Sequence, residues 1–156
     1  MEEIILTQNK VALIDDEDYD LIKKYKWCTS NYHGHYYAAT EVNNRTIKMH
    51  RLILNVPEYL DVDHIDNNGL NNQKSNIRIC TASQNAMNTK KHSDARSKYK
   101  GVWICKDGKT FRIRAGIRVN NKLINLGTFK NEEQAARAYD DAAIKYFGEF
   151  ANINFK

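Results

Sequence analysis

The chain has 156 residues, 42% of them hydrophobic and 28% charged, which excludes a disordered chain and permits one ordinary domain or two to three small ones. The formal net charge is +5 and the pI is near 9.0, which favours a polyanionic partner. The opening Met1-Glu2-Glu3 and the lack of any apolar run longer than four residues predict neither a signal peptide nor a membrane span.

The cysteines and the distribution of charge indicate the kind of cellular compartment and the kind of binding surface to expect. Cys28, Cys80 and Cys105 are odd in number and form no C-x-x-C pair, so we expect reduced thiols in a cytoplasmic protein and no structural zinc. Residues 1–30 hold seven acidic and four basic side chains, whereas residues 96–122 hold one acidic and nine basic side chains. This asymmetry indicates a localised phosphate-binding face.

The N-terminal third predicts small strands and a helix. Residues 2–6 and 10–14 are typical of a short strand pair, and the acidic run at residues 15–18 begins a helical pattern that ends in lysines. Acids at the start and lysines at the end of a helix match its dipole, so we interpret the run as capping and not as a metal site.

A hairpin is predicted next, over residues 27–42, followed by a strand at residues 45–49. His33 and His35 have a spacing found in metal sites, but no third ligand is evident, so both are interpreted as ordinary hairpin residues.

The central segment predicts a strand, a turn, a strand and a helix. Strands are expected at residues 60–66 and 75–80, with a turn at residues 67–69 that can supply positive φ. Thr81 and Gln84 form a T-x-x-Q capping box, which starts a helix at about Ala82 and places Asn85 in its first turns.

This segment carries the residues of a candidate phosphodiester-cleaving site. His64 is suited to act as a general base on water, because its unperturbed pKa of roughly 6.5 matches proton transfer near neutrality. Asp63 and Asn85 offer the oxygen ligands that Mg²⁺ (or Mn²⁺) prefers. Asn76, twelve residues after His64, can bridge the loop and fix the orientation of the histidine. The alternative is that Asp63 and His64 are an ordinary Asp-His pair without a catalytic role, followed by a loop of polar asparagines.

The C-terminal segment predicts a three-stranded sheet packed on one helix. Residues 90–98 are polar and basic and are interpreted as a linker, either solvated or lying along phosphates. Strands are expected at residues 99–105, 111–119 and 122–128, and a helix capped by Asn131 at about residues 132–147. The alternation of the second strand places three arginines on the face that the helix does not cover: Arg112, Arg114 and Arg118.

The central residues resemble the HNH endonucleases of the homing type. Asp63, His64, Asn76 and Asn85, together with His50 upstream and the N-x-x-x-N-I-R phrase around Asn72 and Asn76, match that family's motif. The asparagine at the last position resembles the H-N-N subgroup. The resemblance implies His64 as general base, Asp63 and Asn85 as metal ligands, a structural Asn76, and metal-dependent hydrolysis that leaves a 5′-phosphate and a 3′-hydroxyl. His50 is expected to have a packing or supporting role.

The C-terminal segment, over about residues 99–154, resembles the plant ethylene-response-factor (APETALA-type) DNA-binding domain. The resemblance rests on the strand order, L-G-T-F at residues 126–129 and A-A-x-A-Y-D at residues 135–140. It implies DNA contacts by these residues: Lys100, Gly101, Trp103, Arg114, Arg118 and Tyr139. Arg112 joins the expected DNA-binding residues because it lies in the exposed arginine row. Gly116 stands where that family has glutamate and Asn125 where it has tryptophan, so its base preference is not carried over. The alternative is a solvated, charged sheet face.

We therefore expect an α+β protein in four segments: an N-terminal β/α segment (1–43), a ββα-metal HNH unit (44–89), a basic linker (90–98) and an ethylene-response-factor-type domain (99–156). The predicted function is site-selective cleavage of double-stranded DNA, as a nick or a double-strand break. The alternatives are a non-catalytic DNA-binding regulator and an RNA-binding or RNA-cleaving module. The oligomeric state is left open.

Overall fold

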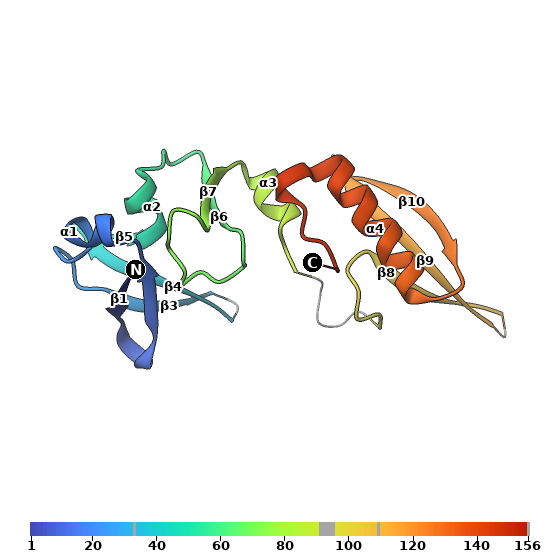
Figure 1. Cartoon of the computed structure of the whole chain (residues 1–156), viewed down its shortest axis with the longest axis horizontal. Coiled ribbons are helices and arrows are strands. Elements are labelled where there is room, and N and C mark those ends of the chain that lie inside the picture. Colours follow the sequence, from blue (N-terminus) through green and yellow to red (C-terminus); the bar gives the residue numbers. More distant parts are fainter. Residues whose placement is uncertain (33, 91–95, 109, 156) are drawn as a thin grey trace. The chain divides into compact units, whose positions relative to one another are not determined.

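The computed structural model describes residues 1–32, 34–90, 96–108 and 110–155. The chain divides into two compact units, Met1–Asn85 and Ala86–Lys156. The mixture of helices and antiparallel strands confirms the predicted α+β class (Figure 1). The four-segment division stays a prediction, and His33 and residues 91–95 of the expected linker lie outside the described residues.

The first unit is built from two hairpins, a three-stranded sheet and short helices. Its sheets have the strand orders β1-β2, β3-β4-β5 and β6-β7, with every neighbouring pair antiparallel. The elements in chain order are β1 (Glu2–Ile5), β2 (Val11–Ile14), α1 (Tyr19–Ile22), β3 (Cys28–Tyr32), β4 (His35–Val42), β5 (Arg45–Lys48), α2 (Met49–Leu54), β6 (Asp61–His64), β7 (Ile77–Cys80) and α3 (Ala82–Met87), the last of which extends two residues into the second unit.

An apolar core joins the N-terminal hairpin of this unit to its sheet and to α2. The buried side chains come from elements far apart in sequence, so long-range packing and not local propensity holds the unit together. They are Leu6, Ala12, Ile14, Ile22, Trp27, Ala38 and Met49. The helix predicted after the acidic run is shorter than expected, with a 3-10 turn at Asp16–Asp18 followed by α1.

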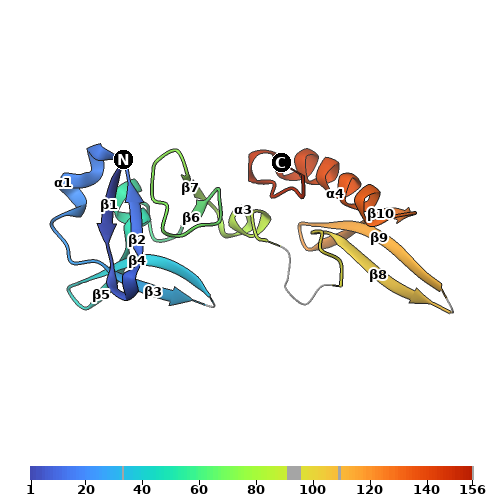
Figure 2. The ribbon, with the colours of Figure 1, turned by 60° about the horizontal axis from the view of Figure 1, so that its bottom comes forward.

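The second unit is a three-stranded sheet with one long helix along it (Figure 2). Its strands β8 (Val102–Asp107), β9 (Thr110–Val119) and β10 (Lys122–Phe129) are antiparallel in the order β10-β9-β8. The helix α4 (Glu132–Phe147) begins where predicted, because the Asn131 side chain accepts a hydrogen bond from the Gln134 N–H at 2.9 Å.

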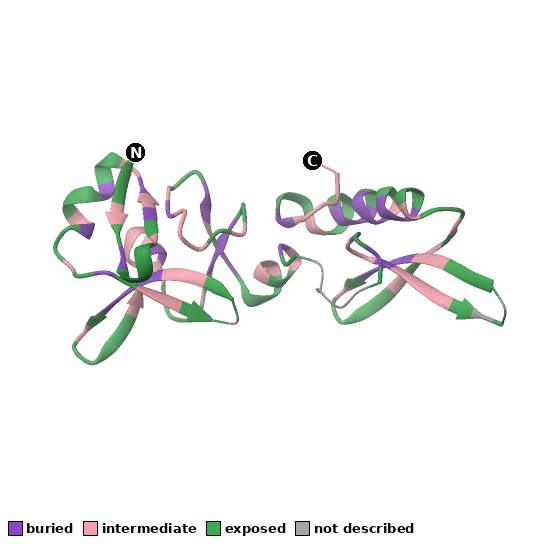
Figure 3. Ribbon diagram, turned by 90° about the horizontal axis from the view of Figure 1, so that it is seen from below, coloured by how far each residue is buried: buried purple, intermediate pink, exposed green. Residues whose placement is uncertain are grey.

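The alanine-rich face of α4 is buried against the middle of β9 (Figure 3). Ala135, Ala136 and Ala143 are fully buried, as is Ala115 on β9, and small side chains allow the helix to approach the sheet closely. Cys28, Cys80 and Cys105 are free thiols, as expected. Among the described residues, no helix has both the length and the apolar character that crossing a membrane requires.

Candidate functional site

His64 is the last residue of β6 and lies in the interior of the first unit. Strand β6 pairs with β7 so that His64 lies opposite Ile77 and Asp63 lies opposite Arg78. The histidine is only 6% exposed. Burial disfavours its charged form and lowers its pKa, while the hydrogen bond to Asn72 acts in the opposite direction. A histidine with a lowered pKa remains neutral, and able to accept a proton, at mildly acidic pH.

Asn72 fixes which nitrogen of His64 carries the proton. The Nε2 atom of His64 lies 3.2 Å from the Oδ1 atom of Asn72, and the Asn72 amide nitrogen donates to the Leu70 carbonyl at 3.1 Å. Because the amide oxygen of Asn72 is an acceptor, the hydrogen-bond network assigns the proton to Nε2. The lone pair of the neutral ring is therefore on Nδ1. Asn72 is completely buried, so this arrangement is held firmly.

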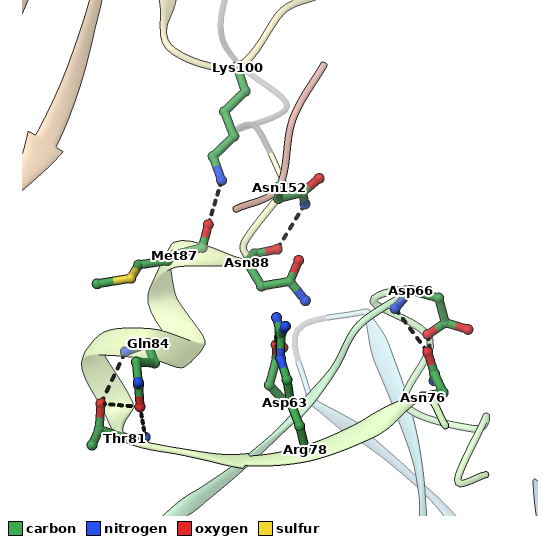
Figure 4. Close-up of polar contacts among 10 residues, drawn as sticks. All are labelled: Asp63, Asp66, Asn76, Arg78, Thr81, Gln84, Met87, Asn88, Lys100 and Asn152. Atoms are coloured by element: carbon green, nitrogen blue, oxygen red, sulfur yellow. Dashed lines mark hydrogen bonds and ion pairs between the residues drawn. The ribbon is translucent and has the colours of Figure 1, made fainter. Parts of the chain in front are cut away.

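Asn76 bridges the loop between the two strands, as the sequence predicts for its amide. Its side-chain nitrogen donates to the Asp66 carboxylate at 2.9 Å and to the Asn71 carbonyl at 2.8 Å, and its oxygen accepts from the Asp66 N–H at 3.1 Å (Figure 4). Burial alone would raise the pKa of Asp66, but hydrogen bonds from Asn71, Asn68 and Asn76 lower it. The ring of His64 is held by Asn72, so Asn76 acts on the loop around it.

Asp63 forms a buried ion pair with Arg78 across the β6–β7 hairpin. The Nε and Nη2 atoms of Arg78 donate to the same carboxylate oxygen, Oδ2, at 2.9 and 2.6 Å. Sequence reasoning gave Arg78 no role. The signal that could have identified it is the register of the hairpin, which places the two residues directly opposite each other.

Asn85 lies in the first turns of α3, where the sequence places it. The capping box forms as predicted: the Thr81 N–H donates to the Gln84 side chain at 2.8 Å, and the Gln84 N–H donates to the Thr81 hydroxyl at 3.2 Å (Figure 4). Asn85 lines a polar pocket of about 210 Å³ together with Tyr37, Thr46, Lys48, His50, Arg51, Asp61 and Val62. Asn85 and His50 therefore share a pocket, whereas the Asp63 carboxylate is held by Arg78.

His50 is the second histidine of this region and packs directly on the first. Its ring meets the His64 ring edge to face, with the centroids 4.9 Å apart, and the Tyr37 ring lies 5.9 Å from it. Burial lowers the pKa of His50 to about 2, and electrostatic interactions with His64, Lys48 and Arg51 act in the same direction. A neutral His50 thus forms one wall of the His64 site.

The N-terminal hairpin anchors the loop between β6 and β7, a set of contacts that sequence reasoning missed. The Asn72 N–H donates to the Leu13 carbonyl at 2.8 Å, so the backbone of the residue that orients His64 is tied to β2. The Asp15 carboxylate accepts from the Gln73 side chain at 3.1 Å and from the Lys74 N–H at 2.7 Å. The start of the acidic run therefore supports the loop.

The donor chemistry of Asp63 and Asn85 fits a hard divalent cation, because a carboxylate and an amide oxygen are the ligands that Mg²⁺ and Mn²⁺ prefer. No cluster of three or more His, Cys, Asp or Glu side chains suited to a metal occurs within the described ranges. A site built on these two residues would take most of its remaining ligands from water and phosphate.

The arginine face predicted for the C-terminal unit is formed by β9. Arg112 and Arg118 are exposed and Arg114 is partly exposed, while Ala115 and Ile117 on the opposite face are buried under α4. The row of guanidinium groups therefore lies on the side of the sheet that α4 does not cover.

Trp103 lies over Gly116 on this face, which explains why a glycine is needed there. A Cβ atom at Gly116 would lie 2.7 Å from the Trp103 ring and 2.9 Å from the Ile124 carbonyl oxygen. The ring of Trp103 thus covers the backbone at Gly116 on the open face of the sheet. Trp103 pairs with Arg114 across β8 and β9, so a flat aromatic surface adjoins an arginine.

Three of the residues predicted to contact DNA have packing roles in this structure. Tyr139 is 3% exposed, and a Cβ atom at Gly101, which has φ +73°, would lie 1.8 Å from its ring. The Lys100 ammonium donates to the Met87 carbonyl at 2.9 Å (Figure 4). It also donates to the Thr89 carbonyl. Burial lowers the pKa of Lys100 to about 8, against the opposing effect of Asp140. DNA contacts by these three residues stay predictions.

Comparisons with known proteins identify relatives for both parts of the chain. A family model described as HNH endonuclease matches residues 55–87, which include β6, β7 and α3. An uncharacterized HNH endonuclease of Acanthamoeba polyphaga mimivirus is 31% identical over 149 residues, which cover 92% of this chain and 74% of that protein.

The second group of relatives is confined to 38% of the chain. APETALA2-like protein 2 of Oryza sativa subsp. indica is 45% identical over 60 residues, and an ethylene-responsive transcription factor of Arabidopsis thaliana is 44% identical over 59 residues. The chain spans 14% of the length of each of these two plant proteins. No solved structure matches the chain.

Proposed function

The chain belongs to the HNH endonuclease family, and we propose that it is a site-selective endonuclease of the homing type that hydrolyses double-stranded DNA with a divalent metal and a histidine general base. The observation that carries this proposal is the buried, neutral imidazole of His64, whose proton is held on Nε2 by Asn72. Its position beside Asp63 provides a base and an oxygen donor on one strand.

His64 acts through its Nδ1 lone pair in this proposal. That nitrogen removes a proton from the attacking water, and Asn72 stabilises the resulting imidazolium because its amide oxygen accepts from the Nε2–H. Asp63 and Asn85 would hold Mg²⁺ or Mn²⁺, which supplies charge stabilisation for the crowded phosphate and the leaving oxygen. Asn76 keeps the loop closed around the histidine.

The C-terminal unit selects where the enzyme binds. A three-stranded sheet with an uncovered row of arginines has the width of a DNA major groove, and arginine binds both guanine edges and phosphates bidentately. The similarity to plant APETALA2-like proteins supports this assignment. With its free thiols, the protein is expected to work in the cytoplasm.

The test is the nicking of supercoiled plasmid carrying a bound site, with Mg²⁺ or with chelator. His64→Ala should abolish nicking and retain the gel shift, because the substituted side chain lies in the first unit. His35→Ala, which removes an exposed histidine from the same unit, serves as the matched control and should cleave normally. Undiminished nicking by His64→Ala would refute the general base.

A non-catalytic DNA-binding regulator is the second candidate, and the Asp63–Arg78 ion pair favours it, because the pair neutralises the anionic metal ligand. This candidate predicts a gel shift without nicking at any concentration of Mg²⁺ or Mn²⁺. Competition between duplex DNA and duplex RNA addresses the third possibility, since the major groove of RNA is too narrow for a sheet.

A further inference from the structure

Arg78 and Asp63 form an ion pair with little contact with water. The Arg78 side chain is 14% exposed and that of Asp63 is 5% exposed, and two nitrogens of the guanidinium donate to a single carboxylate oxygen. Charge-assisted hydrogen bonds of this kind are short and strong, and they are weakened little by dissolved salt when both groups are buried. Figure 4 shows the Arg78 side chain beside that of Asp63.

The same carboxylate is the one anionic ligand of the proposed metal site. With Arg78 in place, the positive charge of the guanidinium cancels the negative charge of Asp63. A divalent cation that approached Oδ2 would meet a unit positive charge about 3 Å from its ligand atom, and burial strengthens the repulsion between the two positive charges. Metal binding at Oδ2 therefore requires Arg78 to release this oxygen.

A DNA phosphate is the partner chemically suited to take the guanidinium. Arginine presents paired N–H donors that match two phosphate oxygens, and a phosphate carries the negative charge that Asp63 now supplies. If Arg78 turned to the phosphate, the Asp63 carboxylate would become available to the cation. DNA and metal would then each favour the binding of the other.

We propose that Arg78 competes with the divalent metal for the Asp63 carboxylate, so that the metal site forms when a DNA phosphate draws the guanidinium away. The proposal deepens the proposed nuclease function and rests on it. It makes the DNA-free protein a poor metal binder, and so keeps hydrolysis dependent on a bound substrate.

The experiment measures Mn²⁺ binding to the full, DNA-free chain by the loss of the free-ion electron paramagnetic resonance signal. Arg78→Met should bind Mn²⁺ at least about tenfold more tightly than the wild type, because removal of an adjacent unit charge is worth more than one factor of ten in affinity. Arg45→Met, which removes an exposed arginine from β5 in the same unit, is the matched control and should bind as the wild type does. Equal or weaker binding by Arg78→Met would overturn the proposal.

Thermal unfolding provides a second readout, since Arg78→Met leaves Asp63 as an uncompensated buried carboxylate. Mn²⁺ should raise the unfolding midpoint of Arg78→Met more than that of the wild type, because the ion replaces the lost positive charge. The double variant Asp63→Asn, Arg78→Met should lose this gain. If the double variant bound Mn²⁺ as tightly as Arg78→Met, the ion would not be at Asp63 and the proposal would be wrong.

Arg78→Lys settles the question if Arg78→Met does not fold. A lysine keeps the charge but replaces the planar fork with a single ammonium, so it should compete less well and give a Mn²⁺ affinity above that of the wild type. An affinity at or below the wild-type value would contradict the competition. These measurements do not depend on cleavage. If His64→Ala lost nicking while Arg78→Met bound Mn²⁺ as the wild type does, the nuclease function would be retained and the proposed role of Arg78 would be wrong.

Discussion

The first unit should lose stability steeply below pH 6.5, and His50 should be a main cause. Its pKa is lowered from 6.5 to about 2, chiefly by burial, and its Nδ1 atom has no hydrogen-bond partner among the described residues. In the unfolded chain this histidine binds a proton as the pH falls through 6.5, whereas in the folded chain it remains neutral. The unfolded state then binds more protons, so the free energy of unfolding decreases with falling pH.

The size of the effect follows from the two pKa values. Each pH unit between them costs about 1.4 kcal/mol for one group, so acidification from pH 7.5 to 4.5 should remove about 3 kcal/mol through His50 alone. His64, whose pKa is also lowered, adds to the loss in the same direction. A small unit of ordinary stability, about 5–15 kcal/mol, would lose a large share of it.

The assay is urea unfolding at several pH values in a Trp103→Phe background, so that fluorescence reports on Trp27 in the first unit. His50→Leu should remove about 3 kcal/mol of the difference in unfolding free energy between pH 7.5 and 4.5, because leucine fills the site without a titrating group. Ile53→Ala, in the same helix, is the control: it should lower the free energy of unfolding by the same amount at every pH, because it removes packing and no titrating group. If the wild type and His50→Leu lost the same free energy on acidification, the reasoning would be refuted.

Three further predictions concern the two units separately. The rate of nicking should fall on the acid side below pH 6.5, and Asn72→Ala should move this fall to still lower pH, because the Asn72 hydrogen bond raises the pKa of His64; an unchanged profile would separate Asn72 from the base. Gly101→Ala should destabilise the second unit by roughly 2–5 kcal/mol in calorimetry, since the added methyl group meets Tyr139 at a positive φ, whereas Gly108→Ala, at a similar φ in open space, should cost only about 1–2 kcal/mol. Affinity for duplex DNA should fall by on the order of 10³ or more between about 50 and 200 mM salt for roughly six phosphate contacts, and a flat dependence would exclude the arginine face as the binding surface.

Local chemistry made the central elements predictable. The T-x-x-Q phrase at Thr81–Gln84 specifies a helix start through hydrogen bonds within four residues, and the structure forms those bonds. The alternating residues of β9 likewise determined which face would carry arginines. Such patterns can be recognised from sequence because the interacting residues are near one another in the chain.

The contacts that were missed join residues distant in sequence. The Asp15 carboxylate supports Gln73 across 58 positions, and no periodicity connects the two residues. The packing of Tyr139 on Gly101 was missed for the same reason, and because the resemblance suggested DNA contacts for both residues. Neither interaction follows from a local pattern, since each depends on how the elements pack.

The asparagine-rich loop shows why composition alone misleads. Asn67 adopts a positive φ of 59°, Asn68 accepts from the Leu70 N–H, and Asn71 donates to Asp66. Asn72 and Asn76 hold His64 and the loop backbone, so all five asparagines have defined structural roles. None of these hydrogen bonds involves the Asp63 carboxylate, so we expect them to persist when DNA binds.

The contrast with Arg78 identifies the part of the site that must change. Asn72 and Asn76 hold the base through contacts that are equally useful before and after a substrate binds. In the Asp63–Arg78 pair, in contrast, the guanidinium that neutralises the carboxylate also repels a metal cation. In such a site, the general base His64 is already oriented before DNA binds. The metal affinity, in contrast, depends on whether Arg78 is paired with Asp63 or with a substrate phosphate. Substrate phosphates would therefore affect Mn²⁺ affinity more than the pH profile of the histidine.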